Sequence, residues 1–176
     1  MPVRPAREVD FPAVLAIVNR EIAEGTAHFG STPTTPNDLR RWLDAQTTLP
    51  WLVEEDDGGS VVGYAIASRW QQREGYDWTL TISVYVHPSA QGRGVGSRLY
   101  AELIPRLDAL GYRTIIAGIA LPNAASVRLH ESFGLKHAGT LPRAGFKLGR
   151  WIDVGYWVRH FGDGPPDRPR SQAQAT

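Results

Sequence analysis

The feature that most constrains this chain is a glycine-rich turn between a predicted strand and a predicted helix. Residues 91–97 read Gln-Gly-Arg-Gly-Val-Gly-Ser; the β-branched run 79–86 precedes them and the helical stretch 98–103 follows. Glycine allows positive φ and a close approach of backbone N–H groups to a ligand, and a helix N-terminus carries roughly half a positive charge. The turn therefore predicts a binding site for a diphosphate.

The spacing within the turn argues against two common nucleotide-binding motifs. A P-loop ends in Gly-Lys-Ser or Gly-Lys-Thr, whereas this turn ends in Gly96-Ser97-Arg98. A dinucleotide fingerprint places its third glycine three residues after the second, whereas Gly96 follows Gly94 after two. Neither nucleotide fold fits well, and a glycine-rich turn with only a structural role stays open as the alternative.

Length, charge and cysteine content narrow the class of protein. A chain of 176 residues suits a single domain, which we assign to residues 1–161. The net charge of +1, with both signs interspersed, argues against nucleic acid or an anionic membrane surface as a partner. Because there is no cysteine, a cysteine acyl-enzyme is excluded and any acyl transfer should be direct. The N-terminus has no apolar signal core and no apolar stretch approaches the roughly 20 residues of a membrane span, so we expect a cytoplasmic enzyme.

Apolar spacing, caps and turn residues predict strands and helices that alternate through the second half of the chain, which indicates a mixed α/β sheet. Residues 162–176 have almost nothing to bury and are predicted to form a disordered tail. A first helix should start after Asp10 and end at Gly25. Three more helices are predicted: one begins at residue 35, one ends at residue 110 and one covers residues 123–133. The predicted strands cover residues 3–6, 51–54, 61–67, 78–86, 114–119, 135–141 and 151–158.

Several stretches together resemble one known family. The Gln-x-x-Gly-x-Gly pattern of the turn resembles the coenzyme A loop of GNAT N-acetyltransferases. Within that superfamily, four stretches resemble the phosphinothricin acetyltransferases, which are similar to methionine sulfone and sulfoximine acetyltransferases. These stretches are 76–79 (Tyr-Asp-Trp-Thr), 121–131 (Leu-Pro-Asn-Ala-Ala-Ser-Val-Arg-Leu-His-Glu), 144–147 (Ala-Gly-Phe-Lys) and 151–157 (Trp-Ile-Asp-Val-Gly-Tyr-Trp).

The resemblance implies a GNAT fold, with a mixed, mostly antiparallel central sheet flanked by about four helices. It also implies a homodimer, no metal, and direct transfer of acetyl from acetyl-CoA to the amino group of a small amine, such as an amino acid or its analogue. Phe29, Trp70, Arg73 and Lys147 would contact that substrate. The implied cofactor contacts are Val84, Tyr85, Val86, Gln91, Gly92, Arg93, Gly94, Val95, Gly96, Ser97, Asn123 and Ser126.

His130 lies where many GNAT enzymes have a tyrosine that protonates the departing thiolate. A histidine can release a proton near neutral pH, so the resemblance implies this role for it. The alternative is a histidine that packs at the end of a helix.

Thr81 departs from the family, which usually has a glutamate there as the general base. An alcohol is far too weak a base to replace it. Asp77 would lie about 13 Å away along the strand, and nothing in the sequence requires Glu74 to fold in. Leu148 and Ile152 also stand where the family often has histidines. Three interpretations stay open: an acetyltransferase with altered amine specificity, a non-catalytic acyl-CoA-binding protein, or a protein-lysine acetyltransferase, which would need an open groove that the bulky Trp70, Trp78 and Trp151 argue against.

Overall fold

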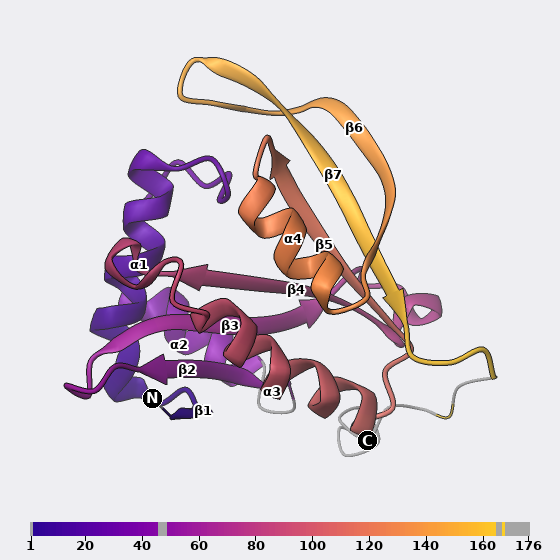
Figure 1. Ribbon diagram of the computed structural model, residues 1–176, viewed down its shortest axis with the longest axis horizontal. Helices are drawn as coiled ribbons and strands as arrows, with labels where there is room; N and C mark the ends of the chain where they lie inside the picture. The colour runs from indigo at the N-terminus through magenta and orange to yellow at the C-terminus, as the bar shows by residue number, and fades with distance from the viewer. Residues whose placement is uncertain (1, 46–48, 165–166, 168–176) are drawn as a thin grey trace.

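The computed structural model describes residues 2–45, 49–164 and 167, and these form a seven-stranded sheet with helices on both faces (Figure 1). The strand order is β1-β2-β3-β4-β5-β7-β6, and all neighbouring strands are antiparallel except β4 and β5. The predicted mixed, mostly antiparallel sheet with four flanking helices is therefore confirmed. The strands are β1 Val3–Pro5, β2 Trp51–Glu55, β3 Val61–Arg69, β4 Thr79–Val86, β5 Thr114–Leu121, β6 Lys136–Lys147 and β7 Arg150–His160. The helices are α1 Phe11–Glu24, α2 Pro36–Ala45, α3 Val95–Ala109 and α4 Ala124–Ser132, with short 3-10 turns at Glu8–Asp10, Glu74–Tyr76 and Pro88–Ala90.

Each face of the sheet has its own apolar core. On one face, α1 and α2 pack against side chains such as Trp51, Val53 and Tyr64. On the other, α3 and α4 pack against side chains such as Leu80 and Ile82. Because side chains alternate along a strand, β4 contributes to both cores and runs through the middle of the molecule.

The pairing of β4 with β5 stops halfway along β4. The parallel register joins Thr79, Leu80 and Thr81 to the start of β5, and it ends at the pair Thr81 and Ile116. Beyond that pair, β5 continues beside β7 as far as Leu121. The two strands diverge in a V (Figure 1), so residues 82–86 of β4 have an edge that is not paired with β5.

Two local details differ from the sequence prediction. Asp10 precedes α1 as predicted, but its carboxylate accepts the backbone N–H of Arg7 at 2.7 Å and pairs with Arg4 instead of capping α1. Strand β6 runs beyond the predicted residue 141, because pairing with β7 resumes at Gly145 after a register shift.

The predicted tail, residues 162–176, lies mostly outside the described residues. Among the helices that the structure describes, none is long and apolar enough to cross a membrane.

Candidate functional site

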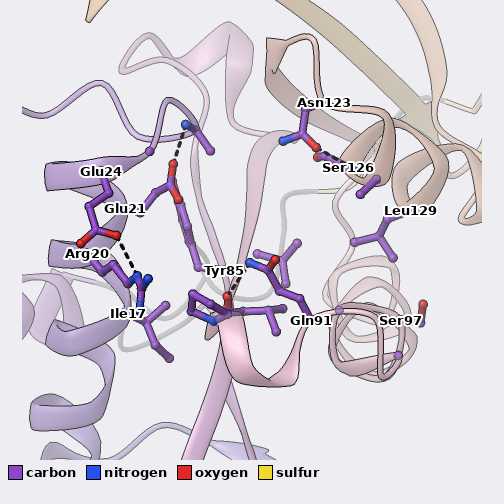
Figure 2. A pocket seen from close by; sticks show the side chains of 18 residues that line it. Ile17, Arg20, Glu21, Glu24, Tyr85, Gln91, Ser97, Asn123, Ser126 and Leu129 are labelled. Atoms are coloured by element: carbon purple, nitrogen blue, oxygen red, sulfur yellow. Dashed lines mark hydrogen bonds and ion pairs between the residues drawn. The ribbon is translucent and has the colours of Figure 1, made fainter. Parts of the chain in front are cut away.

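A cleft of about 490 Å³ opens where β4 leaves β5 (Figure 2). We call it the α1–β4 cleft, because the second half of α1 forms one wall and the free end of β4 forms its floor. The start of α3 and the start of α4 complete it. Its lining residues are Ile17, Arg20, Glu21, Glu24, Gly25, Ala27, Val84, Tyr85, Val86, Pro88, Gln91, Gly94, Gly96, Ser97, Asn123, Ala125, Ser126 and Leu129.

The glycine-rich turn brings the N-terminus of α3 to this cleft. Gly92 and Gly94 have φ of 74° and 78°, a region that residues with a Cβ rarely adopt, and Gly94 is the N-cap of α3. The Gln91 side chain donates to the carbonyl of Val86 at 3.2 Å, which ties the turn to the end of β4. The unpaired N–H groups of the first turn of α3 and the helix dipole make this end of the cleft suitable for an anion.

An ion pair between the half-buried Arg98 and the buried Glu54 supports the turn. Glu54 on β2 is fully buried, and its Oε1 accepts hydrogen bonds from Arg98 on α3 at 2.7 and 3.0 Å. Arg98 also donates to the carbonyl of Arg93 at 2.9 Å. This contact holds the turn against the helix that follows it.

The predicted cofactor residues fall into two groups. Most of them line the α1–β4 cleft, from β4, the turn and α4. Gly92, Arg93 and Val95 do not, and Val95 is buried in the core beneath α3. Asn123 caps α4, because its side-chain oxygen accepts the backbone N–H of Ser126 at 3.1 Å.

His130 is buried between α4 and α3, with both ring nitrogens engaged. Its Nδ1 lies 2.7 Å from the carbonyl oxygen of Ser126, which can only accept, so Nδ1 carries the proton. Its Nε2 then accepts from the hydroxyl of Tyr100 at 2.9 Å. Burial lowers the pKa of His130, and the bond to Ser126 partly opposes this. His130 lines a small cavity of about 50 Å³ at the base of the V, together with Ser83 and Asn123, but as a neutral ring with no free nitrogen.

A second large cavity, of about 380 Å³, lies on the α1 and α2 side of the sheet. We call it the aromatic cavity; it shares Tyr85 with the α1–β4 cleft. Among the described residues, no Asp, Glu, Lys or Arg lines it. Its lining residues are His28, Trp42, Tyr64, Ile66, Ser68, Ser83 and Tyr85.

The titratable groups of the aromatic cavity are neutral near pH 7. Burial raises the pKa of Tyr85 to about 12 and raises that of Tyr64 well above its usual value. Burial, with the charge of Lys147, lowers the pKa of His28, and the charge of Glu21 partly opposes this. The Nδ1 of His28 accepts the backbone N–H of Gly30 at 3.0 Å.

The predicted substrate residues lie outside the lining of this cavity. Phe29 packs against Gly145, Trp70 packs edge-on against Tyr156, and Arg73 is exposed beside a 3-10 turn. Lys147 donates to the backbone carbonyls of Glu21 and His28. Their role as substrate contacts stays a prediction.

Thr81 lies at the vertex of the V, opposite Ser68 of β3 and Ile116 of β5. No described carboxylate lines the aromatic cavity or the small cavity near this vertex. The position that the resemblance assigns to a general base is thus neutral in this chain.

The sequence analysis did not assign many of the lining residues to the site, among them Glu21, Ala27, His28 and Trp42. These four lie on α1, on α2 or on the loop between them. The sequence indicated the helices and the loop, but it gave no sign that this segment folds over the free end of β4.

Comparisons with known proteins agree with this geometry. The sequence model of the acetyltransferase (GNAT) family matches residues 17–135. A phosphinothricin N-acetyltransferase of Streptomyces viridochromogenes is 44% identical, over 95% of this chain and 91% of the relative. An L-methionine sulfoximine/L-methionine sulfone acetyltransferase of Pseudomonas aeruginosa is 38% identical, over 86% of this chain and 90% of the relative. The solved structure of a phosphinothricin acetyltransferase from Sinorhizobium meliloti in complex with AcCoA superposes with a TM-score of 0.90 at 32% identity, covering 96% of this chain and 92% of that one.

Proposed function

We propose a substrate class for this chain, which belongs to the acetyltransferase (GNAT) family. Its substrate is a small amino acid or amino-acid analogue with an uncharged side chain. The chain is an acetyl-CoA-dependent N-acetyltransferase, with acetyl-CoA as co-substrate. The observation that carries the proposal is the aromatic cavity, which shares the lining residue Tyr85 with the α1–β4 cleft.

The α1–β4 cleft would hold acetyl-CoA along its length. The N–H groups at the start of α3 would bind the diphosphate, with Gly94, Gly96 and Ser97 around it. Residues 84–86 would offer backbone groups to the pantetheine amides, because this edge of β4 is not paired with β5. The thioester would then lie near the base of the V, between the cleft and the aromatic cavity.

The amine would enter the aromatic cavity and attack the thioester directly. A backbone N–H of the free β4 edge would stabilise the oxyanion of the tetrahedral intermediate. His130 as the donor to the thiolate stays a prediction. Its two engaged nitrogens and lowered pKa favour the alternative role, in which it packs α4 against α3.

Charge decides between the two substrate types that the relatives' names suggest. Phosphinothricin carries an anionic phosphinate, whereas the sulfone group of methionine sulfone is neutral. Both compounds carry the same α-carboxylate, so the side chain alone distinguishes them. Burying its unpaired charge costs several kcal/mol, and the described lining offers no cation to pair with the phosphinate. We therefore expect kcat/KM for L-methionine sulfone to exceed that for L-phosphinothricin by about tenfold or more.

The test is an assay of thiol release from acetyl-CoA with a panel of amines. Preference for phosphinothricin would contradict the assignment of the uncharged substrate. If no amine releases thiol, the acyl-CoA-binding alternative, which the comparisons do not favour, would replace the enzymatic one.

We also infer a cytoplasmic homodimer. Acetyl-CoA is supplied inside the cell, which supports the cytoplasmic location, and cell fractionation would check it.

The homodimer is supported by the β6–β7 hairpin. This hairpin exposes Leu141, Phe146, Leu148 and Trp151, and such clusters of large apolar side chains mark interaction surfaces. Light scattering should give about twice the chain mass of 19.4 kDa, and Phe146→Glu should shift it to a monomer. A monomeric wild type would contradict this.

A further inference from the structure

We propose that Glu21 supplies the carboxylate that β4 lacks at Thr81, accepting the proton of the substrate ammonium directly or through one water. The proposal rests on the acetyltransferase function above and identifies its general base. Glu21 lies on α1, across the α1–β4 cleft from the strand where the family glutamate is expected.

Its carboxylate is held in a defined position. Oε1 accepts the backbone N–H of Ala27 at 2.7 Å, across the loop that leaves α1. The carboxylate also fills the space beside Gly25, where a Cβ would lie 1.8 Å from Oε1. Lys147 fixes the same segment through the backbone carbonyls of Glu21 and His28. Figure 2 shows the Glu21 side chain on the side of α1 that faces the cleft.

This carboxylate has no ion pair among the described residues, although it lines a cleft suited to an anionic cofactor. In the same wall, Arg20 pairs with Glu24 at 3.0 Å, and the ammonium of Lys147, which comes from β6, binds backbone carbonyls. A carboxylate near a diphosphate weakens binding by repulsion. An unpaired carboxylate at this place is therefore available to accept a proton.

The charge of Glu21 reaches the groups that surround the amine site. It contributes to the raised pKa values of Tyr85 and Tyr64 and opposes the fall in the pKa of His28. All three side chains line the aromatic cavity. Ala27, whose N–H holds the carboxylate, lines both the α1–β4 cleft and the small cavity at the base of the V. Glu21 therefore lies in the wall of the α1–β4 cleft, and the residue that holds its carboxylate lies where this cleft and the small cavity share a lining residue.

The step balances as follows. The ammonium N–H bond breaks and its proton moves to the Glu21 carboxylate, leaving a neutral amine. The amine attacks the thioester carbon, and collapse of the tetrahedral intermediate breaks the C–S bond. The nitrogen loses a second proton, one proton goes to the thiolate, and one proton is released to solvent overall.

Glu21→Gln tests the proposal, because glutamine can keep the bond from Ala27 but is not a base. At about pH 7 we expect kcat to fall by about 100-fold, without a rise in KM for acetyl-CoA. The defect should shrink towards pH 9 to 10, where more of the amine is already deprotonated. The matched control is Glu102→Gln. Glu102 is an exposed glutamate on α3 that pairs with Arg106, and kcat of this variant should stay within about twofold of wild type.

A second variant separates catalysis from structure. Adding Thr81→Glu to Glu21→Gln places a carboxylate at the family position, and kcat of this double variant should be at least about tenfold higher than that of Glu21→Gln alone. Adding Thr81→Gln instead should not raise kcat. The proposal would be overturned if Glu21→Gln had the same kcat as wild type, or if its kcat were lowered by the same factor at every pH. An inactive wild type would instead overturn the proposed function, and this inference with it.

Discussion

Replacing Ser97 by glutamate should raise the Kd for acetyl-CoA by about 100-fold or more while the fold stays intact. Ser97 lies in the first turn of α3 and lines the α1–β4 cleft beside Gly94 and Gly96. A carboxylate there would occupy the anion site and repel the diphosphate. At about 4 Å and an effective dielectric of about 20, each pair of like charges costs about 4 kcal/mol before screening, so a loss of about 3 kcal/mol is a moderate expectation.

The same substitution favours the helix itself. Acidic side chains near a helix N-terminus stabilise it by about 0.3–1 kcal/mol, so the Tm of the free protein should not fall. Ser97→Gln is the matched control, because glutamine has the size of glutamate but no charge. It should weaken acetyl-CoA binding by no more than about tenfold. Titration calorimetry of both variants checks this. Equal Kd values for the two would contradict binding of the diphosphate at this turn.

Replacing Arg98 by methionine should lower the free energy of unfolding by about 3 kcal/mol. Arg98 is the ion-pair partner of Glu54, whose side chain is fully buried, and removing one partner of a buried pair costs about 3–5 kcal/mol. We expect the lower end because the Arg98 side chain is 38% exposed. Acetyl-CoA binding should also weaken, since the turn loses the contact to the carbonyl of Arg93.

The double variant Glu54→Met, Arg98→Met separates the two effects. Replacing a buried pair by apolar side chains is often neutral, so unfolding in urea should return to within about 1 kcal/mol of wild type. The Kd should stay raised, because the support of the turn is still missing. A double variant as unstable as Arg98→Met would show that the buried carboxylate is not the source of the instability.

The sequence predicted most of the fold and most of the residues of β4, the glycine-rich turn and α4 that line the α1–β4 cleft. The reason is that these parts depend on local signals. Gly92 and Gly94 set the turn, Asn123 caps α4, and β-branched runs mark the central strands. Each signal lies within a few residues of the structure that it specifies.

The aromatic cavity, which we propose as the substrate site, depends on contacts between distant segments, which have no local signal. Lys147 on β6 binds the carbonyls of Glu21 and His28, more than 100 residues earlier in the chain. The aromatic cavity combines side chains from the loop after α1, from α2, β3 and β4. The sequence showed that a base was missing at Thr81, but only the fold brings Glu21 to the opposite wall.

The central claim is that acetyl-CoA lies in the α1–β4 cleft, with its diphosphate on the glycine-rich turn and its pantetheine along the free edge of β4. The most direct measurement is an NMR titration of the ¹⁵N-labelled chain with acetyl-CoA. The account predicts the largest amide shifts at Gly92, Gly94 and Gly96 and at residues 84–86, with little change at Val3–Pro5 of the edge strand β1. Saturable binding that leaves the turn and β4 amides unshifted would contradict it, as would the absence of binding.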